Sequence, residues 1–158
     1  MTALKPATGR IAKAGRWSLW ALESVTWPLR APVLQYKFSH SAPLGVTIGV
    51  TTYKDRFEGC LKPLLPKLSA LFPKEQLIVI ANGHYLEEEQ RRYIQQFSSF
   101  CEGPGRIEAE SYIEPKGLSY LWNRIISRAQ YPKVLILNDD IMLKPGFREL
   151  VKRLVAGS

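Results

Sequence analysis

Four short runs of apolar residues, each separated from the next by a segment with helical spacing, constrain the fold of this chain more than any other feature. The runs cover Val46–Thr52, Gln76–Ala81, Ile107–Ile113 and Lys133–Leu137. Strands that alternate with helical segments form βαβ units. The sequence therefore predicts an α/β fold with a mainly parallel sheet and flanking helices.

The segments between these runs have apolar residues at the spacing of helices. In the segment 55–71, Pro63 and Pro66 predict a helix that is broken or begins late. Glycine or a turn precedes two of the other segments, as is common at helix boundaries. We expect these further helices: Leu86–Phe100, Leu118–Ala129 and Phe147–Val155.

Residues 1–42 differ in composition from the rest of the chain. They hold six basic residues and one acidic residue, which give +5 of the net charge of +8, and three of the four tryptophans. A helix from Ile11 to Trp27, ended or kinked at Pro28, would place these tryptophans near one face. Two interpretations stay open: contact of residues 10–30 with a membrane surface, or packing on the domain. We therefore divide the chain into a basic, Trp-rich helical segment (1–42) and an α/β domain (43–158).

Several classes of protein are disfavoured by what the sequence lacks. It has no apolar run of about 18 residues, so it predicts no transmembrane helix. Cys60 and Cys101 do not have the spacing of a metal site or a disulfide framework, which favours a reducing, cytoplasmic location. The membrane interpretation of residues 10–30 would make the chain peripheral at the cytoplasmic membrane face. The phosphate-binding, dinucleotide-binding and hydrolase motifs built on glycine are absent. We expect no nucleic acid partner.

Adjacent carboxylates follow the fourth run, at the edge where parallel sheets of this kind bind ligands. Asn138, Asp139 and Asp140 stand directly after Leu137. Two unpaired carboxylates here would repel each other and cost free energy on desolvation. A divalent cation relieves this repulsion, and Mg²⁺ or Mn²⁺ commonly bridges carboxylates to substrate phosphates. The alternative is an Asp-rich turn whose side chains cap residues 141–144.

The loops after the other runs offer groups that suit a nucleotide. Thr51, Thr52 and Tyr53 supply two hydroxyls and an aromatic ring on which a base can stack. Lys116 and Gly117 precede a helix, and free N–H groups at a helix start bind anions. Each loop also has an interpretation without a ligand, as a polar connection or a helix cap.

Taken together, these pieces resemble the N-terminal half of the family-2 glycosyltransferases, which have the GT-A fold. The resemblance covers residues 44–149 and is carried by Val46–Tyr53, Ile78–Gly83, Lys116–Asn123 and Leu137–Ile141. It implies a Rossmann-like GT-A domain that binds a nucleoside-diphosphate sugar with Mn²⁺ or Mg²⁺. The implied reaction is transfer of the sugar to an acceptor, in surface polysaccharide or glycolipid synthesis.

The resemblance also implies a role for each matching residue. The metal is expected at Asp140 and Asn138. Contacts with the nucleotide sugar are expected from Thr51, Thr52, Tyr53, Asn82, Lys116, Gly117, Asn123, Asn138 and Asp139. The chain departs from the family pattern where Thr51 replaces a proline, Asn138 replaces the first aspartate of the D-x-D motif, and Ala81 or Asn82 replaces an aspartate that recognises the base.

Only 18 residues follow Asp140. In the family, the later part of the domain supplies the acceptor site and, in inverting enzymes, the carboxylate base. We therefore expect a GT-A domain truncated after the D-x-D strand, with no catalytic base in this chain, that depends on an oligomer or a missing C-terminal half. The alternative is a truncated, non-catalytic module that binds a nucleotide or a protein partner.

Overall fold

The computed structural model describes residues 26–84, 86–96, 107–144 and 146–157. Most of the predicted helix Ile11–Trp27 lies outside these residues, as do Phe97, Cys101 and two of the tryptophans of the N-terminal segment. Within the described residues, no helix is both long and apolar enough to cross a membrane.

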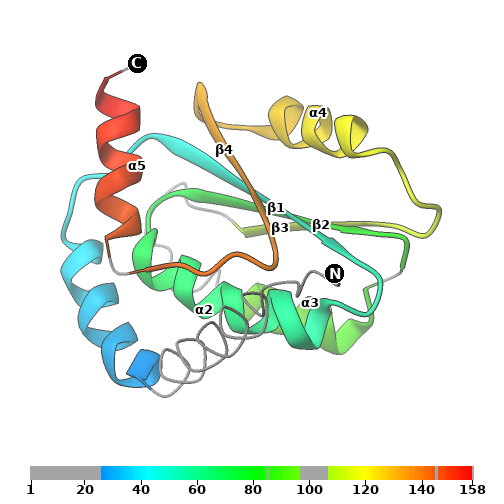
Figure 1. The fold of residues 1–158 in the computed structure, drawn as a ribbon, viewed down its shortest axis with the longest axis horizontal. Helices are drawn as coiled ribbons and strands as arrows, with labels where there is room; N and C mark the ends of the chain where they lie inside the picture. Colours follow the sequence, from blue (N-terminus) through cyan, green and yellow to red (C-terminus); the bar gives the residue numbers. More distant parts are fainter. Residues whose placement is uncertain (1–25, 85, 97–106, 145, 158) are drawn as a thin grey trace, which may run out of the picture.

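The core of the protein is a four-stranded, all-parallel sheet in the order β3-β2-β1-β4 (Figure 1). The predicted parallel α/β sheet is confirmed, and the strand bounds agree with the sequence to within one residue. The register places Thr51 of β1 beside Asn138 of β4, and Tyr53 of β1 beside Asn82 of β2. The strands are β1 (Val46–Tyr53), β2 (Gln76–Asn82), β3 (Ile107–Tyr112) and β4 (Lys133–Asn138).

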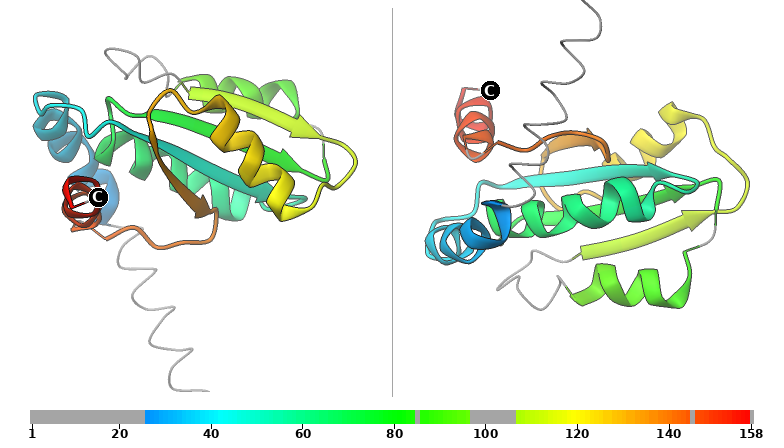
Figure 2. Two further views of the ribbon diagram at one scale, coloured as in Figure 1. Left: turned by 90° about the horizontal axis from the view of Figure 1, so that it is seen from above. Right: turned by 60° about the horizontal axis from the view of Figure 1, so that its bottom comes forward.

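Helices cover both faces of this sheet (Figure 2). One face carries η1 (Phe57–Leu61), α2 (Lys62–Leu71) and α3 (Glu88–Gln96), and the other carries α4 (Leu118–Arg128). The α4 face has its own small core, made by Leu121 and Ile125 against Ile78 and Ile80. Gly49 permits this packing, because a Cβ atom there would lie 2.4 Å from Ile125 Cγ2.

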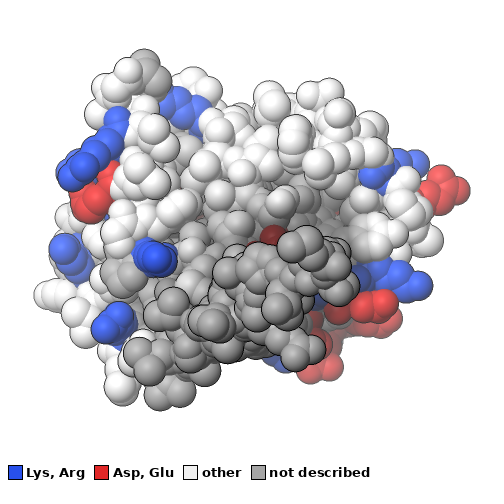
Figure 3. Space-filling model, in the orientation of Figure 1, with Lys and Arg blue, Asp and Glu red and all other residues white. Residues whose placement is uncertain are grey.

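A helix over residues 26–39 packs beside α5 (Phe147–Ala156), near the amino end of β1 (Figure 1). Trp27 and Phe38 belong to the larger hydrophobic core, together with residues of β1 and α2. Pro28 lies within this helix, so of the two outcomes that the sequence predicts, an end or a kink at Pro28, the end is wrong. A proline removes one N–H donor but leaves the residues that follow it free to be helical. Lys and Arg side chains gather over this side of the molecule (Figure 3).

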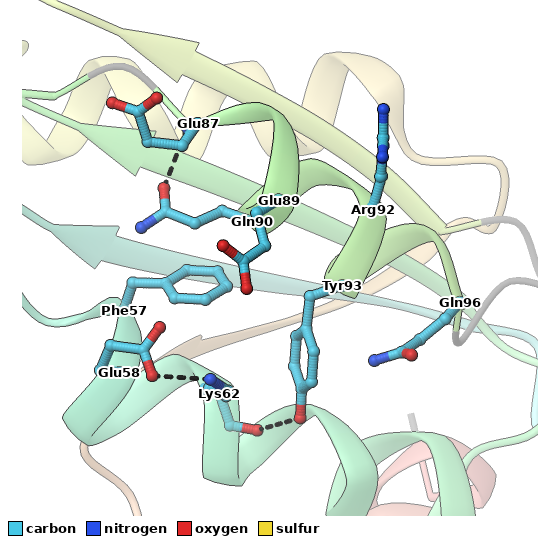
Figure 4. Close-up of a pocket in the computed structure, with 9 residues that line it drawn as sticks. All are labelled: Phe57, Glu58, Lys62, Glu87, Glu89, Gln90, Arg92, Tyr93 and Gln96. Atoms are coloured by element: carbon cyan, nitrogen blue, oxygen red, sulfur yellow. Dashed lines mark hydrogen bonds and ion pairs between the residues drawn. The ribbon is translucent and has the colours of Figure 1, made fainter.

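The segment before β2 is helical although it contains two prolines. A π-helical turn, η1, precedes α2, and Pro63 stands in the first turn of α2, where an N–H has no partner within the helix. Pro66 cannot donate to the carbonyl oxygen of Lys62, four residues before it. The hydroxyl of Tyr93 donates to that oxygen at 3.0 Å instead (Figure 4). The side chain of a neighbouring helix thus replaces the hydrogen bond that the proline removes.

Candidate functional site

The strand order places a topological switch point between β1 and β4. From β1 the chain moves outward to β2 and then β3, and afterwards β4 is added on the opposite side of β1. Sheets of this type bind ligands in the crevice beyond the carboxyl ends of the strands where the order reverses. The loops that begin at Tyr53 and Asn138 meet at this point.

Asp139 is the buried member of the carboxylate pair at the switch point, with only 3% of its surface exposed. Its Oδ2 accepts a hydrogen bond of 2.6 Å from the hydroxyl of Thr52, and its Oδ1 lies 2.8 Å from a guanidinium nitrogen of Arg56. Burial raises the pKa of Asp139 above its ordinary value, although Thr52 and Arg56 oppose the rise. This carboxylate therefore joins the loop after β1 to the loop after β4.

Asp140 is the exposed member of the pair. Its side chain is 57% exposed, and its Oδ2 lies 2.9 Å from the same Arg56 nitrogen that contacts Asp139. The hydrogen bond to Asp140 is the largest contribution that raises the pKa of Arg56. The sequence suggests two uncompensated carboxylates, and the structure corrects this in part, because one guanidinium contacts both of them and offsets one of their two negative charges.

The oxygen donors at this point suit a hard divalent cation that takes few protein ligands. Asp140 presents an exposed carboxylate and Asn138 an exposed amide, whereas both oxygens of Asp139 are already engaged. Among the described residues, no group of three or more His, Cys, Asp and Glu side chains could enclose a metal ion. The donors therefore fit Mg²⁺ or Mn²⁺ held by one or two side chains, with substrate phosphate and water as the remaining ligands.

An aromatic ring lies at the β2 side of the same edge. Tyr53 is 46% exposed, and its ring packs against Gly83, which has a φ of +77°. A Cβ atom at Gly83 would lie 2.9 Å from Tyr53 Cε2 and 3.4 Å from Pro115 Cγ. Glycine is therefore needed here both for its backbone conformation and for the close approach of the ring.

Asn82 braces the loop that leads to α4. Its side-chain amide donates to the carbonyl oxygen of Lys116 at 3.0 Å and accepts from the N–H of Lys116 at 2.8 Å. The carbonyl oxygen of Asn82 also accepts from the N–H of Lys54 at 3.3 Å. The loops after β1, β2 and β3 are thus connected through Asn82, and its side-chain amide fixes the position of the Lys116 backbone.

The amino end of α4 is exposed. Gly117 is the N-cap residue and has an ordinary φ of −63°, and apart from its neighbours in the chain no described atom would lie within 4 Å of a Cβ atom added to it. No contact among the described residues therefore requires glycine at this position, and they leave room for a ligand above it. Asn123 lies further along α4 on its exposed side.

A cavity of about 350 Å³ lies nearby, between η1 and α3 (Figure 4). Its walls include Phe57 and Tyr93, and its charged groups are three glutamates, one lysine and one arginine. An adjoining cavity of about 400 Å³ shares Phe57 and Glu58 and adds Asp55 and His84. The excess of carboxylates disfavours a diphosphate in either cavity. Lys54, Arg56 and Lys116 supply cations in the loops at the carboxyl edge of the sheet, so an anionic ligand is favoured there.

The structure brings most of the predicted site residues to one edge of the sheet. Thr51, Thr52, Tyr53, Asn82, Lys116, Gly117, Asn138, Asp139 and Asp140 all lie at the ends of strands or in the loops that follow them. Arg56 is a site residue that sequence reasoning did not select. It could have been selected because it is a cation three residues after the end of β1, at the same edge of the sheet as the two carboxylates.

Comparisons with known proteins assign no family to this chain: no family model matches it, and no significant match is found among curated proteins or solved structures.

Proposed function

We propose that this chain binds a nucleoside-diphosphate sugar at the switch point and serves in metal-assisted sugar transfer, as the donor-binding part of a GT-A, family-2-like glycosyltransferase. The observation that supports this most strongly is the cluster of Thr52, Arg56, Asp139 and Asp140 between the carboxyl ends of β1 and β4. It has one cation, one hydroxyl and two carboxylates at the edge where α/β sheets bind nucleotides. The proposed acceptor belongs to surface polysaccharide or glycolipid synthesis.

In this proposal the base stacks on the exposed face of Tyr53, whose opposite side rests on Gly83. Aromatic rings provide large, rigid surfaces for such stacking. The diphosphate lies between Arg56 and the Lys116–Gly117 start of α4, where a guanidinium, an ammonium group and free backbone N–H groups attract phosphate oxygens. Asn82 holds the Lys116 backbone in place for this contact.

Asp140, assisted by Asn138, would hold Mn²⁺ or Mg²⁺. When bound there, the ion would stabilise the negative charge that develops on a diphosphate leaving group. Asp139 remains a positioning residue, because Thr52 and Arg56 already engage both of its oxygens. Arg56 contacts both carboxylates through one nitrogen and its side chain is 39% exposed, so it would donate to the phosphates while it keeps Asp139 in place.

A second candidate function is a module that binds a nucleotide without catalysis. The observation that favours it is the pairing of both carboxylates with Arg56, which offsets one of their two negative charges without a divalent cation. Such a module would bind a nucleoside diphosphate directly through Arg56 and Lys116. The two candidates differ in whether nucleotide binding depends on metal.

Calorimetric titration of UDP, GDP and dTDP, each with and without Mn²⁺, tests the proposal. We expect at least one nucleotide to bind with Mn²⁺ present, and Asp140→Ala to remove that binding. Glu89→Gln is the matched control, because it removes an exposed carboxylate from the neighbouring cavity and leaves the switch point intact. Binding that is equal with and without metal, and unchanged in Asp140→Ala, would support the non-catalytic module. Failure of all three nucleotides with metal present would refute the donor-site proposal.

A further inference from the structure

The helix over residues 26–39 has apolar side chains on two opposite faces. Trp27 and Phe38 face the core, where only 6% and 5% of their surfaces are exposed. Leu29, Val33 and Tyr36 are 78%, 68% and 72% exposed, and their spacing of four and three residues aligns them along one side of the helix. We call Leu29, Val33 and Tyr36 the outer stripe. Within the part of the chain that the structure describes, this second face makes no contact with the core.

We propose that the outer stripe binds an anionic lipid surface. The inference is independent of the proposed sugar transfer, because it involves no residue of the switch point. It rests on three observations: the exposed apolar stripe, the distribution of charge along the chain, and the way the fold brings the charged ends together.

Charge is distributed unevenly along the chain. Residues 45–140, which contain the whole sheet, hold 12 basic and 12 acidic residues and are neutral as a group. Residues 1–44 have a net charge of +5, and residues 141–158 have a net charge of +3. The two ends of the chain therefore account for the entire net charge of +8.

The fold places the described parts of these two ends, the helix over residues 26–39 and α5, side by side. The guanidinium of Arg148, in α5, lies 4.8 Å from the ring centroid of Phe38, in the 26–39 helix. Both helices lie beside the amino end of β1, away from the switch point (Figure 1). Figure 3 shows mainly Lys and Arg over this side of the molecule, with one acidic patch among them, whereas acidic and basic groups are mixed on the opposite side. Exposed cations of the described ends flank the stripe and α5: Arg30, Lys37, Lys144, Lys152 and Arg153.

A lipid surface fits this combination better than another partner of negative charge. Exposed Leu and Val side chains gain free energy when they enter the boundary between headgroups and acyl chains, and Tyr prefers that boundary. A nucleic acid backbone would use the cations but leave the aliphatic side chains in water. Lys and Arg beside the stripe would contact anionic headgroups, each contributing about 1 kcal/mol, or roughly fivefold in the partition coefficient.

A second exposed apolar surface provides an internal comparison. On α4 and the loop before it, Ile126 and Ile113 are 53% and 66% exposed. The cations of α4 are paired there, since Arg124 lies 3.0 Å from Glu110 and Arg128 lies 2.6 Å from Glu108. Aliphatic exposure is thus similar in the two places, but only the outer stripe is accompanied by unbalanced positive charge.

Sedimentation with vesicles of phosphatidylcholine alone, and of equal parts phosphatidylcholine and phosphatidylglycerol, tests the proposal on the full chain. We expect binding only to the anionic vesicles. Leu29→Ser/Val33→Ser should reduce the partition coefficient roughly tenfold or more, and Arg30→Gln/Lys37→Gln should reduce it by more than tenfold. The matched control Ile113→Ser/Ile126→Ser should bind as the wild type does. All these side chains are exposed, so the variants should keep the wild-type thermal midpoint.

Three results would overturn the proposal. The first is no binding of the wild type to anionic vesicles. The second is equal binding of the wild type and the outer-stripe variant. The third is a wild-type chain that forms a dimer by light scattering, becomes monomeric when the stripe is substituted, and does not bind vesicles, which would make the stripe a contact between copies of the chain.

Discussion

Thr52 donates a hydrogen bond of 2.6 Å to Asp139, a residue 87 positions later in the chain. The two residues stand at the carboxyl ends of neighbouring strands, so this bond fixes the two loops that form the switch point. Because Asp139 is buried, its carboxylate has little water to replace a lost donor. The bond therefore contributes to stability as well as to the shape of the site.

Thr52→Val removes the donor but keeps the shape of the side chain. We expect a loss of about 1–3 kcal/mol in the free energy of unfolding, because a buried acceptor is left unsatisfied. Urea denaturation followed by circular dichroism measures this loss. Thr52→Ser is the matched control, since it retains the hydroxyl and should lose less. Equal losses in the two variants would show that the methyl group, rather than the hydrogen bond, is responsible.

Arg56→Gln should raise the affinity of the site for Mn²⁺ alone. The substitution removes the guanidinium that compensates Asp139 and Asp140, so a free cation meets two uncompensated carboxylates. We expect roughly a fivefold increase or more, since partly exposed charges each contribute about 1 kcal/mol. Titration followed by electron paramagnetic resonance of free Mn²⁺ measures this affinity without any nucleotide.

Lys54→Gln is the control for that experiment. It removes an exposed cation of the same loop, one that makes no ion pair among the described residues, and it should change the Mn²⁺ affinity little. An Arg56→Gln variant that binds Mn²⁺ no better than the wild type would indicate that Asp140 is not a cation ligand.

Glu110 predicts a dependence of stability on pH. Burial raises the pKa of Glu110, but the Tyr112 hydroxyl and the Arg124 and Arg128 guanidinium groups outweigh burial and lower it. A carboxylate whose pKa is lower in the folded state contributes stability above its ordinary pKa range, and that contribution is lost as the pH falls through the lowered value. Glu110→Gln should therefore be less stable than the wild type at neutral pH, by about 1–3 kcal/mol.

The difference between Glu110→Gln and the wild type should shrink as the pH falls below the ordinary glutamate range. Urea unfolding at a series of pH values measures it. Glu114→Gln is the control, because Glu114 is an exposed glutamate in the loop after β3 and has one weak ion pair of 3.5 Å. A difference that stays constant with pH would assign the effect to shape rather than to charge.

The strands could be predicted from sequence because each is buried and so consists of consecutive apolar residues. The bounds of β1 and β4 differ from the prediction by one residue each. In a parallel sheet the loops that follow the strands all lie at the carboxyl edge. The sequence could therefore predict that Thr52 and Asp139 lie close together there. The sequence therefore predicted the scaffold and the location of the candidate site.

The compensation of charge at the site could not be predicted in the same way. Which of Lys54 and Arg56 reaches the carboxylates depends on the path of the loop, in which Asp55 has a φ of 61°. The path of the 26–39 helix was also missed, because Pro28 is a strong local signal for a helix end. Packing of Trp27 and Phe38 into the core overrides that signal. Local propensity is a weak guide where tertiary contacts decide the outcome.

The buried pair of Arg148 and Glu75 predicts how α5 is held to the domain. Their side chains are 3% and 0% exposed and lie 3.4 Å apart, and Arg148 also donates to the carbonyl oxygen of Leu71 at 2.7 Å. Arg148→Met should cost about 3–5 kcal/mol, because it leaves the Glu75 carboxylate buried without its cation. Glu75→Gln should also destabilise the fold, since it leaves the buried guanidinium of Arg148 without its carboxylate, although an amide oxygen can still accept the hydrogen bond of 2.7 Å from the N–H of Leu44.

The double variant Arg148→Met/Glu75→Gln separates charge from packing. It leaves no unpaired buried charge, so we expect its loss of stability to be smaller than the sum of the two single losses. A double-mutant cycle of urea unfolding measures this difference. Additive losses would mean that the two residues act independently, with Arg148 stabilising α5 through its contacts with the rings of Phe38 and Phe72 rather than through its charge.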